Sequence, residues 1–197
     1  MEQYKDLFQI THNDVLPARG SILIAEPFLQ DAYFQRSVVL LIEHNDEGSM
    51  GFVVNKKSGL VVNDFFPELE NLPEIPIYLG GPVSGDRLFF IHTLGDVLIP
   101  GAEKIGDNLY FDGEFEALKR YILKGYPVEG RIKFFLGYSG WTEHQLKNEI
   151  ERDSWVVSRV YENLFQADGD AFWNSSVVLL GGKYRTWVNY PKDPYYN

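Results

Sequence analysis

Histidines offer most of the acid–base chemistry that this sequence could perform near neutral pH. They stand at four scattered positions without i, i+4 spacing: His12, His44, His92 and His144. His44 and His92 each follow an apolar, strand-like segment, so the two would meet at one sheet edge if those strands were neighbours. Glu43 directly precedes His44, but adjacent residues of a strand point to opposite faces. Two histidines with separate hydrogen bonds are the simpler interpretation, and we predict no metal site.

Two glycine-containing segments have some features of catalytic or phosphate-binding loops. The segment 137–140, Gly-Tyr-Ser-Gly, stands between a predicted strand and a predicted helix, as a nucleophile elbow does. That motif requires glycine two residues after the serine, and Trp141 stands there instead. Gly80-Gly81-Pro82 lacks the spacing of the common phosphate-binding motifs. We therefore predict no catalytic residue and no cofactor, and we expect structural turns at Gly80, Gly81, Pro82, Gly137 and Gly140.

Aromatic and polar residues gather after the segment 137–140. They are Trp141, Gln145, Glu149 and Trp155. Thr142 and Gln145 have the spacing of a capping box, which predicts a helix from there to about residue 152. A buried indole N–H needs an acceptor, and Gln145 or Glu149 could supply it, which favours a packing role. The alternative is a pocket for a small ligand or peptide, with candidate binding residues Arg36, Glu43, His44, Asn55, His92, Tyr138, Trp141, Gln145 and Glu149.

The elements that must position these residues follow from the pattern of apolar side chains. Val38–Ile42 is an unbroken aliphatic run, typical of a central strand buried on both faces. Turn-forming residues at 45–48 predict a hairpin into Met50–Asn55. Arg131–Leu136 alternates as a half-buried strand does, which places on one face Ile132, Phe134, Leu136 and Tyr138, and on the other Arg131, Lys133 and Phe135. Helices are predicted over 114–124, 162–167 and 171–180.

The composition narrows the class of protein. With 197 residues, 45% of them hydrophobic and 15% aromatic, the chain can form one domain with a large aromatic core. It has no cysteine, which excludes disulfides and thiolate sites and fits a reducing compartment. Its net charge of −10 and its scattered basic residues disfavour nucleic acid as a partner. The start does not read as a signal peptide, and no apolar run approaches the roughly 20 residues that span a bilayer, so we expect a cytoplasmic protein.

Four sequence segments, in this order, carry a family resemblance. They are GSILIAEPFLQDAYFQRSVVLLIEHNDEGSMGFVVNK (Gly20–Lys56), YLGGPV (Tyr78–Val83), FFIH (Phe89–His92), and GYSGW with the later Gln-Leu, Glu and Trp. Together they resemble the UPF0301 family, also called the YqgE/AlgH family. The resemblance implies an α+β fold with a strongly bent mixed sheet, partly barrel-like, and helices packed outside. We expect an N-terminal arm at 1–17 and a single domain at 18–197.

The resemblance implies a soluble, cytoplasmic protein without an established biochemical activity, although some members carry a transcriptional-regulator label. The first functional hypothesis is therefore a non-enzymatic binding or regulatory protein that acts through a protein or small-molecule partner. The second is an enzyme or metabolite-binding protein with a site near His44, His92 and the segment Gly137–Glu149. The third is a transcriptional regulator, for which the net charge of −10 disfavours direct DNA binding. The sequence leaves the partner and the oligomeric state open.

Overall fold

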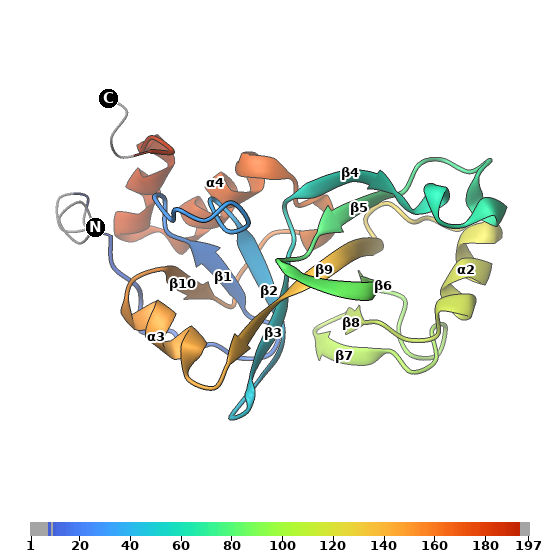
Figure 1. Cartoon of the computed structure of the whole chain (residues 1–197), viewed down its shortest axis with the longest axis horizontal. Coiled ribbons are helices and arrows are strands. Elements are labelled where there is room, and N and C mark those ends of the chain that lie inside the picture. Colours follow the sequence, from blue (N-terminus) through green and yellow to red (C-terminus); the bar gives the residue numbers. More distant parts are fainter. Residues whose placement is uncertain (1–7, 9, 194–197) are drawn as a thin grey trace.

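The computed structural model describes residue 8 and residues 10–193, which form one α+β domain around a strongly curled sheet (Figure 1). The ten strands are β1 (Ile22–Ala25), β2 (Val38–Asn45), β3 (Gly48–Val53), β4 (Lys57–Val61), β5 (Pro76–Leu79), β6 (Val83–His92), β7 (Glu103–Gly106), β8 (Leu109–Phe111), β9 (Ile132–Thr142) and β10 (Trp155–Ser158). The α-helices are α2 (Phe115–Leu123), α3 (Gln145–Glu151) and α4 (Gly169–Leu180). Short 3-10 helices lie at η1 (Val62–Asp64), η2 (Pro67–Leu69), η3 (Leu164–Gln166) and η4 (Gly182–Asn189). The expected fold class is confirmed.

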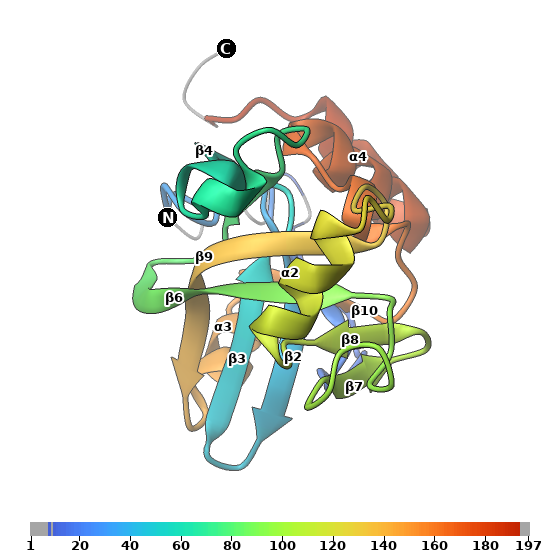
Figure 2. The same ribbon diagram turned by 90° about the vertical axis from the view of Figure 1, so that its right-hand side faces the viewer.

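The long strand β9 joins the two halves of the sheet. The strand order is β10-β1-β2-β3-β9-β6-β8-β7; off this path, β5 pairs with β9 and β4 pairs with β5. The end of β9 pairs antiparallel with β3, and its first part pairs parallel with β5 and antiparallel with β6. Figure 2 shows how β9 bends as it passes from one half to the other. The bend curls the sheet around an aromatic core.

Strand β2 is buried on both faces, as the aliphatic run predicts. Val38, Leu40 and Ile42 belong to the core cluster that α4 covers, where Trp173 lies. Val39 and Leu41 belong to the opposite cluster. The hairpin predicted at 45–48 is also confirmed, since β2 and β3 pair up to Asn45 and Gly48.

The segment 137–140 is not the turn that the glycines suggest. Strand β9 continues through it to Thr142, so the helix begins only at Gln145. Gly137 has φ +69, a conformation that glycine adopts easily, and it interrupts the alternation of side chains. Tyr138 therefore packs with the cluster of Phe135, on the face opposite to Leu136, and not with Ile132 and Phe134 as predicted.

Gly80 and Gly81 lie against this bend of β9. A Cβ on Gly80 would stand 2.3 Å from the carbonyl oxygen of Gly137, and one on Gly81 would stand 2.4 Å from the backbone of Tyr138. Ser139 is fully buried there, and its Oγ donates a hydrogen bond to the Gly80 carbonyl at 3.0 Å. The connection of β5 to β6 thus requires residues without side chains because two backbones touch.

The remaining helices lie at the predicted positions, but one of them is a 3-10 helix and not an α-helix. Helix α2 and helix α4 match the ranges predicted at 114–124 and 171–180, while 162–167 holds only the single 3-10 turn η3. Residues 1–7 and residue 9 of the predicted arm at 1–17 lie outside the described residues, but Phe8 contacts the ring of Phe28 and Ile10 is buried. No helix in residue 8 and residues 10–193 is long and apolar enough to cross a membrane.

Candidate functional site

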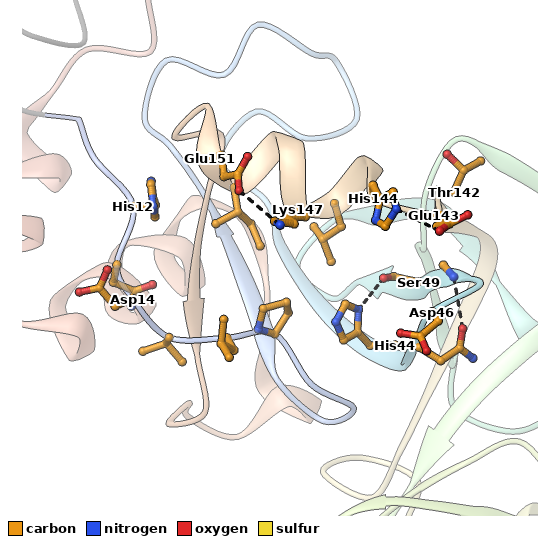
Figure 3. A pocket seen from close by; sticks show the side chains of 18 residues that line it. His12, Asp14, His44, Asp46, Ser49, Thr142, Glu143, His144, Lys147 and Glu151 are labelled. Atoms are coloured by element: carbon orange, nitrogen blue, oxygen red, sulfur yellow. Dashed lines mark hydrogen bonds and ion pairs between the residues drawn. The ribbon is translucent and has the colours of Figure 1, made fainter.

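An open groove of about 790 Å³ runs across one end of the molecule (Figure 3). Three segments far apart in the sequence form its walls. They are the N-terminal segment 12–17, the tip of the β2–β3 hairpin at 44–49, and residues 142–151, which include α3. The fold brings them together because β9 carries α3 past the hairpin, with Gly48 paired to Thr142.

The N-terminal wall is held against the edge of strand β10. The Asn13 side chain donates to the Val157 carbonyl at 2.8 Å and accepts from the Val157 N–H at 3.2 Å, as a neighbouring strand would. Both the backbone N–H and Nδ1 of His12 contact the Asp153 carboxylate, at 2.8 and 2.7 Å. These contacts fix segment 12–17 as part of the groove.

The groove carries an excess of negative charge. Four carboxylates line it, from Asp14, Asp46, Glu143 and Glu151, against one lysine, Lys147. Lys147 lies 3.8 Å from Glu151, and Glu143 lies 3.0 Å from the His144 ring. In the described part of the chain no ion pair involves Asp14 or Asp46, so the groove keeps a net negative charge.

Apolar side chains make the floor and one rim of the groove. Leu146 and Ile150 of α3 are buried and lie along its floor. On the opposite wall, Leu16 is 75% exposed and Val15 is 37% exposed. A large aliphatic side chain held open to water next to carboxylates suits a ligand that is both apolar and cationic.

Three of the four histidines line the groove, and His44 has a hydroxyl partner there. Its Nδ1 lies 2.7 Å from Ser49 Oγ across the hairpin. Glu43, beside it, accepts instead from the Asn45 side chain at 2.9 Å. Within residue 8 and residues 10–193, no group of three or more His, Asp or Glu side chains is placed to hold a metal ion.

The aromatic and polar residues of α3 form a hydrogen-bonded cluster behind the groove. Oε2 of Glu149 accepts from the indole N–H of Trp141 and from that of Trp155, each at 2.8 Å. Its Oε1 accepts from Gln145 Nε2 at 3.0 Å, and Gln145 Oε1 accepts from the Thr142 N–H at 3.1 Å. This is the hydrogen bonding that a packing role requires, and it fixes α3 to β9 and β10.

His44 and His92 are not brought together. Strands β3 and β9 lie between β2 and β6, and His44 connects through Ser49 to Trp141, whereas His92 pairs with Ile132 at the other end of β9. On the order of 30 Å of extended chain separates those two ends. His92 is fully buried; its Nδ1 accepts from the Leu94 N–H, and its Nε2 lies 3.0 Å from the Asp112 carbonyl. Burial lowers the pKa of His92, so this ring is neutral at pH 7.

The remaining candidates lie outside the groove. Asn55 accepts from the Val38 N–H and donates to the carbonyls of Arg36 and Gly169, which joins β2 to α4. Arg36 donates to the Tyr190 carbonyl at 2.6 Å and lies over the Trp173 ring. Tyr138 packs on the Phe89 ring. These three side chains contact other residues of the fold, and none of them lines the groove.

Sequence reasoning missed the acidic and apolar walls of the groove. Asp14 and Leu16 belong to the segment read only as an arm, and Asp46 to a segment read only as a turn. One signal was available: Val15 and Leu16 are aliphatic residues in an otherwise polar segment before Pro17. This signal does not identify the hairpin tip and the helix that form the other two walls of the groove.

Comparison with known proteins gives consistent matches along the chain. A family model described as DUF179, AlgH-like, matches residues 22–185. A UPF0301 protein of Parabacteroides distasonis is 68% identical over 198 residues, covering 100% of both chains. Another, of Bacteroides thetaiotaomicron, is 49% identical and covers 98% of this chain and 97% of its own length.

Two solved structures share the fold. A crystal structure of a Corynebacterium diphtheriae protein has a TM-score of 0.73 at 23% identity, covering 92% of this chain and 96% of that one. The solution structure of the AlgH protein from Pseudomonas aeruginosa has a TM-score of 0.67 at 28% identity, covering 86% and 93%. The range of the family model contains the hairpin and α3, which are two of the three walls of the groove.

Proposed function

The chain belongs to the AlgH-like UPF0301 family, and from this membership we propose that it is a non-enzymatic binding protein whose groove receives a segment of a partner protein. The observation that carries the proposal is the composition of the groove. Uncompensated carboxylates stand beside exposed aliphatic side chains in a space of about 790 Å³. The partner segment is therefore basic and partly apolar.

The shape and charge of the groove favour an extended peptide. The walls are contributed by an N-terminal segment, a hairpin tip and a helix, and the space between them is partly open to solvent. Basic side chains of a bound segment would pair with Asp14 and Asp46, and an aliphatic side chain would pack on Leu16 and Ile150. Charge complementarity of this kind sets specificity and the rate of association. The same charge disfavours DNA, so a regulatory role would act through the protein partner.

Selection from a random peptide library would test the proposal. We expect the peptides that bind to combine Lys or Arg with Leu, Ile or Phe, and to bind more weakly at high salt. Asp46→Lys or Leu16→Glu should each weaken binding about tenfold, as expected for losing one charge pair or one apolar contact. The matched controls are Asp96→Lys and Val97→Glu, which make the same changes at exposed positions outside the groove. Selected peptides that bind equally to all four variants would contradict the proposal.

A second candidate function rests on the pair of His44 and Ser49. Their separation of 2.7 Å is that of a serine with its general base, which is the first requirement of a hydrolase. A catalytic pair also needs a group that orients the histidine, and Glu43 is turned to Asn45 instead. Labelling by a fluorophosphonate probe that disappears in Ser49→Ala would establish this alternative, and absence of labelling would leave the binding function.

We place this binding in the cytoplasm, which a chain without cysteine fits. Fractionation of cells that express a tagged copy tests the compartment, and recovery of the protein outside the cytoplasmic fraction would contradict it.

A further inference from the structure

A second cavity, of about 870 Å³, lies apart from the groove. Its walls come from residues 72–78, from the segment 125–130 that follows α2, from the start of β9, and from residues 165–168. No residue lines both cavities, so a ligand here is independent of the function proposed for the groove. The volume is in the range that holds metabolite-sized molecules.

One cation lies buried in the wall of this cavity. Lys133 is only 3% exposed, and its Nζ donates to the carbonyls of Leu164 at 3.0 Å and Ala167 at 2.7 Å. The third direction of the ammonium faces the Tyr78 ring, whose centroid is 3.7 Å away. All three neighbours carry partial negative charge and none carries a full one.

No carboxylate of the described residues lies within ion-pair distance of Lys133. Asp168 is the nearest influence of that sign: its charge raises the pKa of Lys133, while the charge of Lys57 lowers it. Burial outweighs both and lowers the pKa of Lys133 to about 7. Charged groups are rarely fully buried without a counter-ion, so the absence of one here is unusual.

The carboxylates of the cavity lie on its rim. Glu74, Glu129 and Asp168 are all exposed to solvent, and Asp168 is engaged by Lys57 at 2.7 Å. Solvent screens these rim charges, whereas the buried charge is not screened. The interior is therefore the part of the cavity that selects the charge of a ligand, and it is positive whenever Lys133 is protonated.

Apart from Lys57 and Gln166, the rest of the lining is mainly apolar. Ile75 and Ile132 are buried in the wall, and Val128 and Phe165 are half-buried beside them. Prolines at 73, 76 and 127 add rigid apolar surface. Such walls suit a hydrocarbon or aromatic body and offer it little hydrogen bonding.

We propose that this second cavity binds a small organic anion, a carboxylate on an apolar body. The carboxylate is the counter-ion of Lys133 and replaces the contact of the ammonium with the Tyr78 ring. The apolar body lies on Ile75, Val128 and Phe165. A charge-assisted hydrogen bond in a buried site is stronger than the ring contact that it replaces.

Binding of an anion is linked to a proton. A carboxylate beside Lys133 favours its ammonium form, so at pH 8 the protein takes up a proton as the ligand binds. Affinity should then fall about tenfold per pH unit once the pH exceeds the pKa of the free protein's Lys133. A structural lysine that is not part of a site would show neither effect.

Calorimetric titration with octanoate, octanol and octanamide tests the proposal. These probes share one apolar body, and only octanoate is charged. We expect octanoate to bind at least about ten times more tightly than the other two, and its heat at pH 8 to differ between phosphate and Tris as proton uptake requires. Equal affinity for the three probes, or an affinity for octanoate that does not change with pH, would overturn the proposal.

Variants locate the site. Lys133→Gln should remove the preference for octanoate, while Lys147→Gln, the same change in the groove, should leave it intact. Val128→Asp places a like charge in the wall and should weaken octanoate at least about tenfold without altering the buried lysine. If Lys133→Gln does not fold, octanoate binding to Val128→Asp and the pH profile of the wild type decide whether the ligand lies beside Lys133. Full octanoate binding in Val128→Asp would contradict the site.

Discussion

Glu149 holds two buried tryptophans, and its removal gives a prediction whose size can be worked from the contacts. In Glu149→Ala the indole N–H groups of Trp141 and Trp155 lose their acceptor, although both rings stay buried. Each unsatisfied buried donor costs about 1–3 kcal/mol, so the free energy of unfolding should fall by about 2–6 kcal/mol. That is a large part of the roughly 5–15 kcal/mol typical of a folded protein.

Glu149→Gln should lie between the wild type and Glu149→Ala. One amide oxygen can still accept from both indoles, but without a full charge, and the amide nitrogen then faces Gln145 Nε2 in place of an acceptor. A hydrogen bond to a neutral group contributes roughly half as much as one to a charged group, so we expect a loss of about 1–3 kcal/mol. Urea denaturation followed by circular dichroism measures both variants, with equal m-values as the check on a two-state comparison.

The control is Glu151→Ala on the same helix. Glu151 is exposed, and its ion pair with Lys147 is long, at 3.8 Å, so this change should cost less than about 0.5 kcal/mol. A Trp155→Phe background removes one indole N–H, and there the cost of Glu149→Ala should fall by about half. If Glu149→Ala costs no more than Glu151→Ala, the two indole bonds do not stabilise the fold and the reasoning is refuted.

Three further changes test other parts of the fold. Folding lowers the pKa of Lys133 from 10.5 to about 7, so between these two pH values only the unfolded chain carries the proton. The free energy of unfolding should therefore rise with pH in this range by about 1 kcal/mol per pH unit, relative to Lys133→Met. Parallel pH profiles of denaturation for the wild type and Lys133→Met would refute this. Gly81→Ala places a Cβ 2.4 Å from β9 and should lower the melting temperature far more than Gly59→Ala, which also has positive φ but an open surrounding; similar melting temperatures in a thermal scan would contradict the close packing. Asn55→Ala breaks three hydrogen bonds of a buried amide and should cost about 2–4 kcal/mol in urea denaturation, against less than about 0.5 for the exposed Asn148→Ala; a difference below 1 kcal/mol would show that water replaces the amide.

An element could be predicted from the sequence where its own residues determine what must surround it. The aliphatic run Val38–Ile42 needs both faces covered wherever it lies, and the turn at 45–48 sets its own hairpin. The bend in β9 could not be predicted in the same way. Glycine at 137 permits a turn and permits a bend in a continuing strand, and the partner that decides between them, β3, lies far away in the sequence.

The same difference between local and long-range information explains which features of the candidate sites could be predicted. Two acceptors for the indoles could be predicted, Gln145 and Glu149, because both stand between the two tryptophans in the sequence. The structure uses Glu149. The separation of His44 from His92 depends on the strand order, which the sequence does not encode locally. Lys133 was placed on the second face of a half-buried strand, but residues 164–167 cover that face, and only the complete chain brings them there.

The place of β9 at the centre of the sheet has a consequence for how the chain folds as it is synthesised. Its partner β3 leaves the ribosome on the order of 90 residues before it, which at roughly 5–20 residues per second is a wait of several seconds. During that wait the hairpin of β2 and β3 has an open edge and a run of uncovered aliphatic residues, both of which favour aggregation. The pairing of such distant segments also makes folding slow after release. The nascent chain is therefore most vulnerable between the synthesis of residue 53 and that of residue 142, and a chaperone that covers apolar segments would act in that interval.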